Sequence, residues 1–352
     1  MSSSSLNTST SGRRPSYSHP ARPHVLAVLT PQEQEHFLPG DAMRELGELA
    51  GTLTLADSTK LDQDTLAELL QKTHPDVLLA CWKTPPLPAE PPPSLRYVCY
   101  LAGSVRKLVT RRHVENGLLV TTWGNSISRT VAECALLLVL ACLRRVNGWT
   151  LDMHLRGAWK APDFVTHSLF GRRVGLHGFG RISQNLAELL KPFDVQISAL
   201  SPSVTDDLLA KHGVARATSL EELFSGSEII VELAGLTPRS QHSVREEHLR
   251  MIPEPGVFVN VGRGAIVEPE GLLRVAREGR IQFGLDVHEV EPLPADSPLR
   301  GMHNVMLLPH LGGPTIDRRR DAGAFALENL RAFIDGRTPD ALVSPQVYDS
   351  AS

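Results

Sequence analysis

Short apolar runs alternate with helical patterns along most of this 352-residue chain, and this alternation limits the fold more than any other feature of the sequence. The apolar runs of the first half are HVLAVL (24–29), LTL near 53, DVLLAC (76–81), RYVCYL (96–101) and LLVTT (118–122). Helical patterns around 41–50 and at 64–73 lie between them, which predicts βαβ units and a parallel sheet. The proline-dense TPPLPAEPPP (84–93) predicts a surface loop, because proline does not fit a helix interior.

A second alternating series begins at Arg173 and contains six candidate strands. They are RVGLH (173–177), VQISAL (195–200), EIIVEL (228–233), VFVNV (257–261), QFGLDV (282–287) and NVMLL (304–308). Six is the number of strands in a doubly wound dinucleotide-binding sheet. Long helical patterns near 129–146 and 315–335 bracket this series. The predicted fold is therefore α/β, with two doubly wound parallel-sheet (Rossmann-like) domains, the second inserted into a discontinuous first one.

Composition and charge exclude several classes of protein. With 41% hydrophobic residues the chain can bury a sizeable core, and its formal charge of −3 argues against nucleic acid and anionic membrane as partners. The longest apolar run, VAECALLLVLACL (131–143), is shorter than the ~18 residues of a membrane span, so it predicts a buried helix that could form a subunit contact. The cysteines at 81, 99, 134 and 142 lack a C-x-x-C pair, which predicts buried thiols, a reducing compartment and no bound metal.

The first 22 residues are rich in Ser and Thr, and the chain has no acidic residue before Glu33. Such a composition cannot bury enough apolar surface to fold, so we expect a disordered tail over 1–22 and a cytoplasmic protein. An organellar transit peptide is the alternative, although the segment has almost no apolar face.

A glycine turn, GLHGFGRIS (175–183), follows the first apolar run of the second series and precedes a helical pattern. Gly178 and Gly180 suit a tight turn and a close approach of the backbone to a pyrophosphate, whereas Ser183 stands at the usual place of a third glycine. The anion site depends on main-chain N–H groups and the helix N-terminus, so we expect it to survive the small serine side chain. A tight turn that binds no nucleotide is the alternative.

Charged side chains follow three of the predicted strands where each strand ends. Arg263 follows VFVNV, Asp286 lies at the tip of QFGLDV with Glu291 a few residues beyond it, and His310 follows NVMLL. Each is a weak signal alone, but ligands of open α/β sheets bind at this edge. Arginine can grip a carboxylate, histidine can give a proton to a carbonyl oxygen, and a carboxylate beside the imidazole raises its pKa. Together these residues predict the reduction of a carbonyl group in a small anionic acid.

With these motifs the sequence resembles the D-isomer-specific 2-hydroxyacid dehydrogenases, which include phosphoglycerate, glyoxylate and hydroxypyruvate reductases. The resemblance covers about residues 75–335. The motifs that carry it are RTVAE (129–133), GLHGFGRIS (175–183), NVGRGAIVEPEGLL (260–273), GLDVHEVEPLP (284–294) and LLPHLGGPT (307–315). Taken in this order, the motifs are far more specific than the glycine turn alone.

The resemblance implies hydride transfer between NAD(P)H and a small 2-keto acid or D-2-hydroxy acid. His310 would be the acid/base, Glu291 its partner, and Arg263 the residue that orients the substrate carboxylate. The cofactor contacts it implies are Gly178, Phe179, Gly180, Arg181, Ile182, Ser201, Thr237, Val261, Gly262, Asp286, Gly312 and Gly313. Asp286 would hold the nicotinamide carboxamide.

For the substrate carboxylate, the resemblance implies backbone amides of Ala102, Gly103 and Ser104, although AGS could equally be a simple turn. It also implies a homodimer. The expected domains are a substrate-binding, flavodoxin-like domain (23–128 and 318–352) and an NAD(P)-binding Rossmann domain (129–317).

Two departures from the family pattern concern the cofactor. Ser201 replaces the aspartate that usually binds the ribose hydroxyls, which removes the charge that would repel a 2′-phosphate. No Arg or Lys follows until Lys211, so we expect NAD or NADP with a relaxed preference or a lean toward NADP. In VELAGLTPRS (231–240), Leu233 and Gly235 replace the usual His and Pro, which leaves the contacts around Thr237 open.

Two other functions remain open at this stage. One is a non-catalytic, NAD(H)-sensing module like the related corepressors, although the chain keeps all three catalytic residue types. The other is a phosphite dehydrogenase; a formate dehydrogenase is disfavoured because glutamine usually replaces Glu291 there. The residues that would line the substrate cleft, Trp82, Lys83 and 123–125, follow no pattern that identifies the acid, and Lys83 could meet an anionic substrate or be an exposed loop residue.

Overall fold

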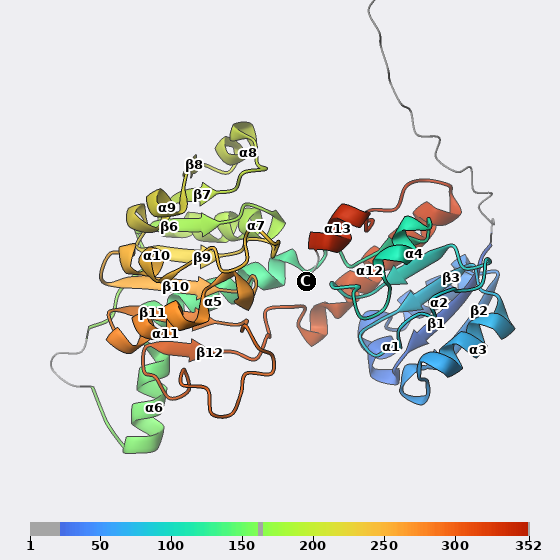
Figure 1. Ribbon diagram of the computed structural model, residues 1–352, viewed down its shortest axis with the longest axis horizontal. Helices are drawn as coiled ribbons and strands as arrows, with labels where there is room; N and C mark the ends of the chain where they lie inside the picture. The colour runs from blue at the N-terminus through green and yellow to red at the C-terminus, as the bar shows by residue number, and fades with distance from the viewer. Residues whose placement is uncertain (1–21, 161–164, 351–352) are drawn as a thin grey trace, which may run out of the picture.

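A computed structural model describes residues 22–160 and 165–350 as two lobes, each built on a parallel β-sheet (Figure 1). Residues 1–21 of the expected tail lie outside the described residues. The α/β class with two doubly wound domains, predicted from the alternation of apolar runs and helices, is confirmed.

The first sheet has the order β2-β1-β3-β4-β5, and each neighbouring pair of strands is parallel. Its strands are β1 (His24–Leu29), β2 (Thr52–Asp57), β3 (Val77–Ala80), β4 (Tyr97–Tyr100) and β5 (Leu119–Thr121). Its helices are α1 (Pro31–Phe37), α2 (Asp41–Leu49), α3 (Gln63–Thr73), α4 (Arg111–Glu115), α12 (Arg319–Ile334) and α13 (Pro345–Ser350). The central strands β3 and β4 are fully buried, which explains why they read as continuous apolar runs.

Helix α12 carries the C-terminal segment back to the first lobe, which it reaches after the second sheet is complete (Figure 1). The Phe333 ring packs on Tyr97 of β4, with 5.0 Å between the ring centroids. Gly323 lies so close to α1 that an added Cβ would stand 1.7 Å from the carbonyl oxygen of Phe37. The first domain is therefore discontinuous, as predicted.

The second sheet has seven strands in the order β12-β11-β10-β9-β6-β7-β8, again all parallel. They are β6 (Arg173–His177), β7 (Gln196–Leu200), β8 (Val214–Arg216), β9 (Ile229–Glu232), β10 (Gly256–Asn260), β11 (Ile281–Leu285) and β12 (Val305–Leu307). The predicted count of six was wrong, because β8 was missed. This edge strand has only three residues, two of them exposed, so it shows neither an apolar run nor an alternation.

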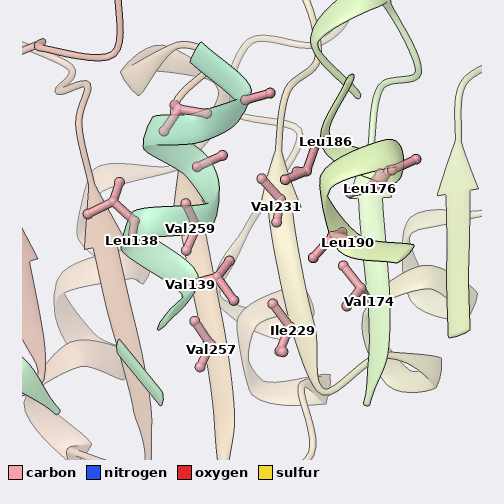
Figure 2. Close-up of a cluster of buried hydrophobic side chains, with 14 of the residues drawn as sticks. Leu138, Val139, Val174, Leu176, Leu186, Leu190, Ile229, Val231, Val257 and Val259 are labelled. Atoms are coloured by element: carbon pink, nitrogen blue, oxygen red, sulfur yellow. The ribbon is translucent and has the colours of Figure 1, made fainter. Parts of the chain in front are cut away.

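The core of this lobe explains why the apolar runs and helices associate. Its helices are α5 (Ser128–Leu143), α6 (Val146–Arg156), α7 (Arg181–Leu190), α8 (Asp206–Lys211), α9 (Leu220–Gly226), α10 (Glu246–Met251) and α11 (Pro269–Glu278). Figure 2 shows Leu138 and Val139 of α5 and Leu186 and Leu190 of α7 facing the sheet. The facing strand residues are Val174, Leu176, Ile229, Val231, Val257 and Val259. Burial of these side chains is the main force that holds both helices on the sheet.

The apolar run at 131–143 forms most of α5, and much of that helix is buried, as predicted. No helix in residues 22–160 and 165–350 is long and apolar enough to cross a membrane. The four thiols are free; Cys81, Cys99 and Cys142 are buried as predicted, whereas Cys134 is half-buried.

Candidate active site

The order of the second sheet reverses between β6 and β9, because β6 pairs with β7 on one side and with β9 on the other. The connections from these two strands therefore leave in opposite directions and open a crevice at their carboxyl ends. The glycine turn follows β6 at this point.

Gly178 and Gly180 serve the turn in different ways. Gly178 has φ of 90°, and a Cβ added to it would lie 2.8 Å from the Cα of Ala234, so only glycine fits. A Cβ on Gly180, the N-cap of α7, would meet nothing within 4 Å. The first amides of α7 have no helical carbonyl to bind and face this open space with the positive end of the helix dipole. The loop therefore fits a pyrophosphate.

Ser183 does more than replace a glycine. Its side chain is buried, and its hydroxyl donates a hydrogen bond of 2.8 Å to the carbonyl oxygen of Gly178. This bond ties the first turn of α7 back to the start of the loop. The serine therefore stabilises the turn, whereas the sequence predicted only that the turn would survive this side chain.

The side chains of the other residues expected to touch the cofactor on this side make contacts within the protein. The Phe179 ring is buried against His212, with 5.8 Å between the ring centroids, and Ile182 packs against the core. Arg181 is exposed and donates to the side-chain oxygen of Gln184 at 3.3 Å. Thr237 is held in a turn by Ser240, whose hydroxyl accepts a 2.7 Å bond from the Thr237 amide.

Two buried contacts shape the loop that carries Arg263. The amide of Gly262 donates to Oδ1 of Asn260 at 3.0 Å, and Nδ2 of Asn260 donates to the Arg263 carbonyl at 3.0 Å. Gly264 lies directly against the backbone of His288, where a Cβ would stand 2.0 Å from the carbonyl carbon. The Arg263 loop is thus pressed against the segment that leads to Glu291. Val261, which precedes this loop, is a buried core residue.

His310 and Glu291, which come from different strand ends, form a direct pair. Nδ1 of His310 lies 2.7 Å from Oε2 of Glu291, and the His288 amide donates to the other carboxylate oxygen at 3.0 Å. Burial raises the pKa of Glu291, but the hydrogen bonds from His310 and His288 and the charges of both histidines lower it overall. Glu291 is therefore ionised at neutral pH and fixes the tautomer of His310.

Arg263 completes the group. Burial lowers the pKa of its guanidinium, and the charge of Glu291 acts in the opposite direction. Its side chain donates a 2.7 Å hydrogen bond to the Gly262 carbonyl. The structure therefore brings together the cation, acid and imidazole predicted from separate strand ends.

Asp286 holds the His310 segment in place. One carboxylate oxygen accepts from the amide of Leu311 at 2.7 Å, and the other accepts from Gly312 at 2.8 Å. The amide of His310 donates to the Asp286 carbonyl at 2.8 Å. His310 has φ of 56°, a conformation that costs about 1–3 kcal/mol and persists only where neighbouring contacts impose it.

Cys134 lies near this carboxylate, 3.7 Å from the position of a Cβ on Gly312. Burial, together with the charges of Asp286 and Glu133, raises the pKa of its thiol to about 12. The thiol therefore stays protonated and is unsuited to act as a nucleophile. Gly313, which follows Gly312, has open space where its Cβ would be.

A cation that was not predicted from the sequence lies beside Ser201. Arg216 donates to the carbonyl oxygens of Val204, at 2.7 Å, and Ser201, at 3.5 Å, and also pairs with Asp206. Ser201 directly follows β7, and Arg216 ends β8, so the guanidinium lies beside the position where the family usually has an aspartate. Its position 15 residues beyond Ser201 gave no signal, because β8 itself was not predicted.

The expected substrate turn, Ala102 to Ser104, follows β4 in the first lobe. The Trp123 ring packs against this turn so closely that a Cβ on Gly103 would lie 2.9 Å from the indole nitrogen. The Trp82 ring meets Trp123 edge-on at 5.9 Å. An aromatic wall thus borders this turn. Lys83 is exposed beside Trp82, and its backbone amide donates to Glu33.

Comparisons with known proteins show the family and the fold of the chain. The family model described as "D-isomer specific 2-hydroxyacid dehydrogenase, NAD binding domain" matches residues 136–312. Glyoxylate reductase of Aeropyrum pernix is 33% identical over 262 residues, which cover 72% of this chain and 78% of that protein. Hydroxyphenylpyruvate reductase of Plectranthus scutellarioides is 35% identical over 248 residues, with coverages of 70% and 77%. The solved structure of D-2-hydroxyisocaproate dehydrogenase has the same fold, with a TM-score of 0.77 over 91% of this chain and 99% of that one at 20% identity.

The contact between Gly312 and Asp286 can be tested directly. A Cβ at position 312 would lie 2.7 Å from Oδ2 of Asp286, so Gly312→Ala should displace the His310 segment and lower kcat/KM by about a hundredfold. Gly47→Ala, whose added Cβ meets nothing within 4 Å on α2 of the other lobe, is the matched control. Full activity of Gly312→Ala in a steady-state assay would contradict the positioning role of Asp286.

Proposed function

The chain belongs to the D-isomer specific 2-hydroxyacid dehydrogenases, and on this premise we propose that it reduces a small 2-keto acid with His310 as the acid/base residue. It is an NAD(P)-dependent D-2-hydroxyacid dehydrogenase. The observation that carries the proposed role is the 2.7 Å contact between Nδ1 of His310 and Glu291, beside the loop of Arg263.

In the proposed reaction His310 moves the proton. Glu291 accepts the Nδ1 hydrogen bond, which leaves Nε2 to protonate the carbonyl oxygen of the keto acid. Bound NAD(P)H supplies the hydride that reduces the carbonyl carbon. In the oxidative direction His310 takes the proton from the hydroxyl group, and the negative charge of Glu291 stabilises the imidazolium that results.

Arg263 and the backbone of 102–104 are proposed to orient the substrate. A guanidinium can bind a carboxylate through two parallel hydrogen bonds, and burial of Arg263 strengthens that attraction by excluding water. The amides of the turn after β4 would meet the same carboxylate from the other lobe. The relatives named as glyoxylate and hydroxyphenylpyruvate reductases support a substrate of this class.

The acid/base role can be tested by His310→Ala. This change should lower kcat by at least about a thousandfold, because it removes the proton donor, while NAD(P)H binding measured by fluorescence stays within about twofold. The substrate panel should include glyoxylate, hydroxypyruvate and phenylpyruvate, with phosphite tested in the oxidative direction.

Three outcomes would count against this function. Full activity of His310→Ala would overturn the assignment of the acid/base residue. Cofactor binding by the wild-type protein without turnover of any 2-keto acid would favour a sensor module instead. Oxidation of phosphite alone would favour a phosphite dehydrogenase.

For the cofactor, we propose a relaxed preference that leans toward NADP(H). Ser201 places no negative charge at the end of β7, and the guanidinium of Arg216 lies within 3.5 Å of its carbonyl oxygen. Asp206, the carboxylate partner of Arg216, is 83% exposed, so a 2′-phosphate could displace it at little cost. Residues 202–210 contain no Arg or Lys, which left the choice between NAD and NADP open in the sequence. Arg216 is the cation that we propose for this role.

Arg216→Ala tests this preference. It should lower kcat/KM with NADPH by about tenfold, as expected for the loss of one charged hydrogen bond, and change kcat/KM with NADH by less than about twofold. Lys211→Ala, which removes a nearby exposed cation of α8, is the matched control. A strong preference of the wild-type enzyme for NADH would contradict the proposal.

We further propose that the enzyme is a homodimer that uses α6. This helix buries none of its residues and projects from the second lobe (Figure 1). Met153, Leu155 and the nearby Trp159 are all large and exposed, Leu155 by 75% and Trp159 by 73%. Exposed large apolar side chains on one segment are typical of a subunit interface.

The dimer can be tested by Leu155→Glu. A carboxylate in an apolar interface would be costly to desolvate, so sedimentation should change from the mass of two 38.5 kDa chains to that of one. Leu55→Glu, at a 52% exposed leucine of β2 in the other lobe, should leave the mass unchanged. A wild-type protein that sediments as a single chain would exclude this interface.

A further inference from the structure

A histidine and a glutamate form a buried pair directly beneath the glycine turn. His177 is the last residue of β6 and Glu232 is the last residue of β9, the two strands at which the sheet order reverses. Nδ1 of His177 lies 2.5 Å from Oε2 of Glu232. The Glu232 side chain is fully buried and that of His177 is 11% exposed. A carboxylate without contact to water needs this partner.

The same pair joins two loops at the crevice. Oε1 of Glu232 accepts a 2.9 Å hydrogen bond from the amide of Ala234, and the carbonyl of His177 accepts one of 2.9 Å from Leu233. These bonds hold the segment after β9 against Gly178, where the contact is too close for any Cβ. The position of the glycine turn therefore depends on the loop that Glu232 anchors.

The charge of the pair depends on one proton. Burial lowers the pKa of His177, but the charge of Glu232 and its hydrogen bond outweigh burial and raise the pKa above its ordinary value of 6.5. No titratable residue lies on β7 or β10, which flank the pair in the sheet. The titratable residues of the helices packed on these strands are Arg129, Glu133, Cys134 and Cys142 of α5, Arg181 and Glu188 of α7, and Glu221 and Glu222 of α9. Among the described residues, Glu232 is the charge that shifts His177.

We propose that His177 and Glu232 are positioning residues for the dinucleotide loop, and that loss of the His177 proton weakens cofactor binding. With the proton the pair is neutral overall. Without it, the carboxylate of Glu232 stays beneath the site of a pyrophosphate and repels it. The raised pKa means that the ion pair is complete at low pH and is lost as pH rises through that pKa. The inference rests on the proposed function only in placing the cofactor on the glycine turn.

The test is the Kd of reduced cofactor between pH 7 and 9, measured in a His310→Ala background so that the catalytic imidazole cannot contribute. Above pH 7 the 2′-phosphate of NADPH is ionised, since its second pKa is about 6. We expect Kd to rise by about three- to tenfold across this range. By linkage, calorimetry in two buffers should also detect net proton uptake on binding at pH 8, a measurement that needs no change at 177 or 232.

Two variants with an uncharged side chain distinguish an electrostatic role of the pair from a purely structural one. Glu232→Gln keeps an acceptor for the amide of Ala234 but removes the charge. The Kd of this variant should therefore be constant from pH 7 to 9 and lower than the parent's Kd at pH 9. His177→Gln removes the group whose proton the proposal invokes, so the Kd of this variant should not follow the parent's pH profile. His303→Asn, at a histidine that precedes the edge strand β12 of the same sheet, is the matched control and should retain the parent's pH profile.

The outcomes distinguish this inference from the function on which it rests. A parent Kd that is constant from pH 7 to 9, with no proton uptake, would overturn the inference and leave the enzyme assignment intact. An unchanged pH profile in Glu232→Gln would overturn it as well. Failure of the wild-type protein to bind either cofactor at any pH would instead refute the placement of the dinucleotide on the glycine turn.

Discussion

Parallel pairing of all the named strands is the constraint on which the rest of the structure depends. It sends every strand of a sheet to the same edge, so loops that are far apart in sequence must pack together there. Such packing is possible only where backbone can approach backbone. Gly178 lies against Ala234, and Gly264 lies against His288, each closer than a Cβ would allow. The glycines of the motifs therefore determine how closely the functional loops converge.

Buried polar side chains then fix these loops in one arrangement. Asn260 bonds the backbone on both sides of Gly262, and Asp286 bonds the amides of Leu311 and Gly312. A buried donor or acceptor left unsatisfied costs about 1–3 kcal/mol, so each alternative loop position that breaks such a bond is disfavoured. The same contacts that satisfy the core thus orient Arg263 and His310.

Much of this arrangement could be predicted from the sequence, because the information was local. The apolar runs of the central strands are continuous, and a charged residue after such a run must lie at the carboxyl edge. Arg263, Glu291 and His310 could be located in this way, and the structure places His310 and Glu291 in contact. Strand β8 has only three residues, which are mostly exposed, so neither this strand nor Arg216 at its end could be predicted.

The pair His177 and Glu232 was missed for a different reason. The two residues are 55 positions apart, and each reads alone as a polar residue at the end of an apolar run. Only the strand order, in which β6 and β9 are neighbours although β7 and β8 intervene in sequence, brings them together. Sequence patterns give the edge at which a residue lies but not its neighbour along that edge.

Both ends of the proposed dinucleotide site combine a cation with a carboxylate. His177 pairs with Glu232 beneath the glycine turn, and Arg216 pairs with Asp206 beside Ser201. A carboxylate holds the cation in a defined position and also reduces the net attraction for an anion. An enzyme that must release its cofactor in each cycle gains from that reduction, since very tight binding of substrate or cofactor does not raise kcat. The two pairs differ in burial, which is why a proton can control the first, whereas solvent and salt weaken the second.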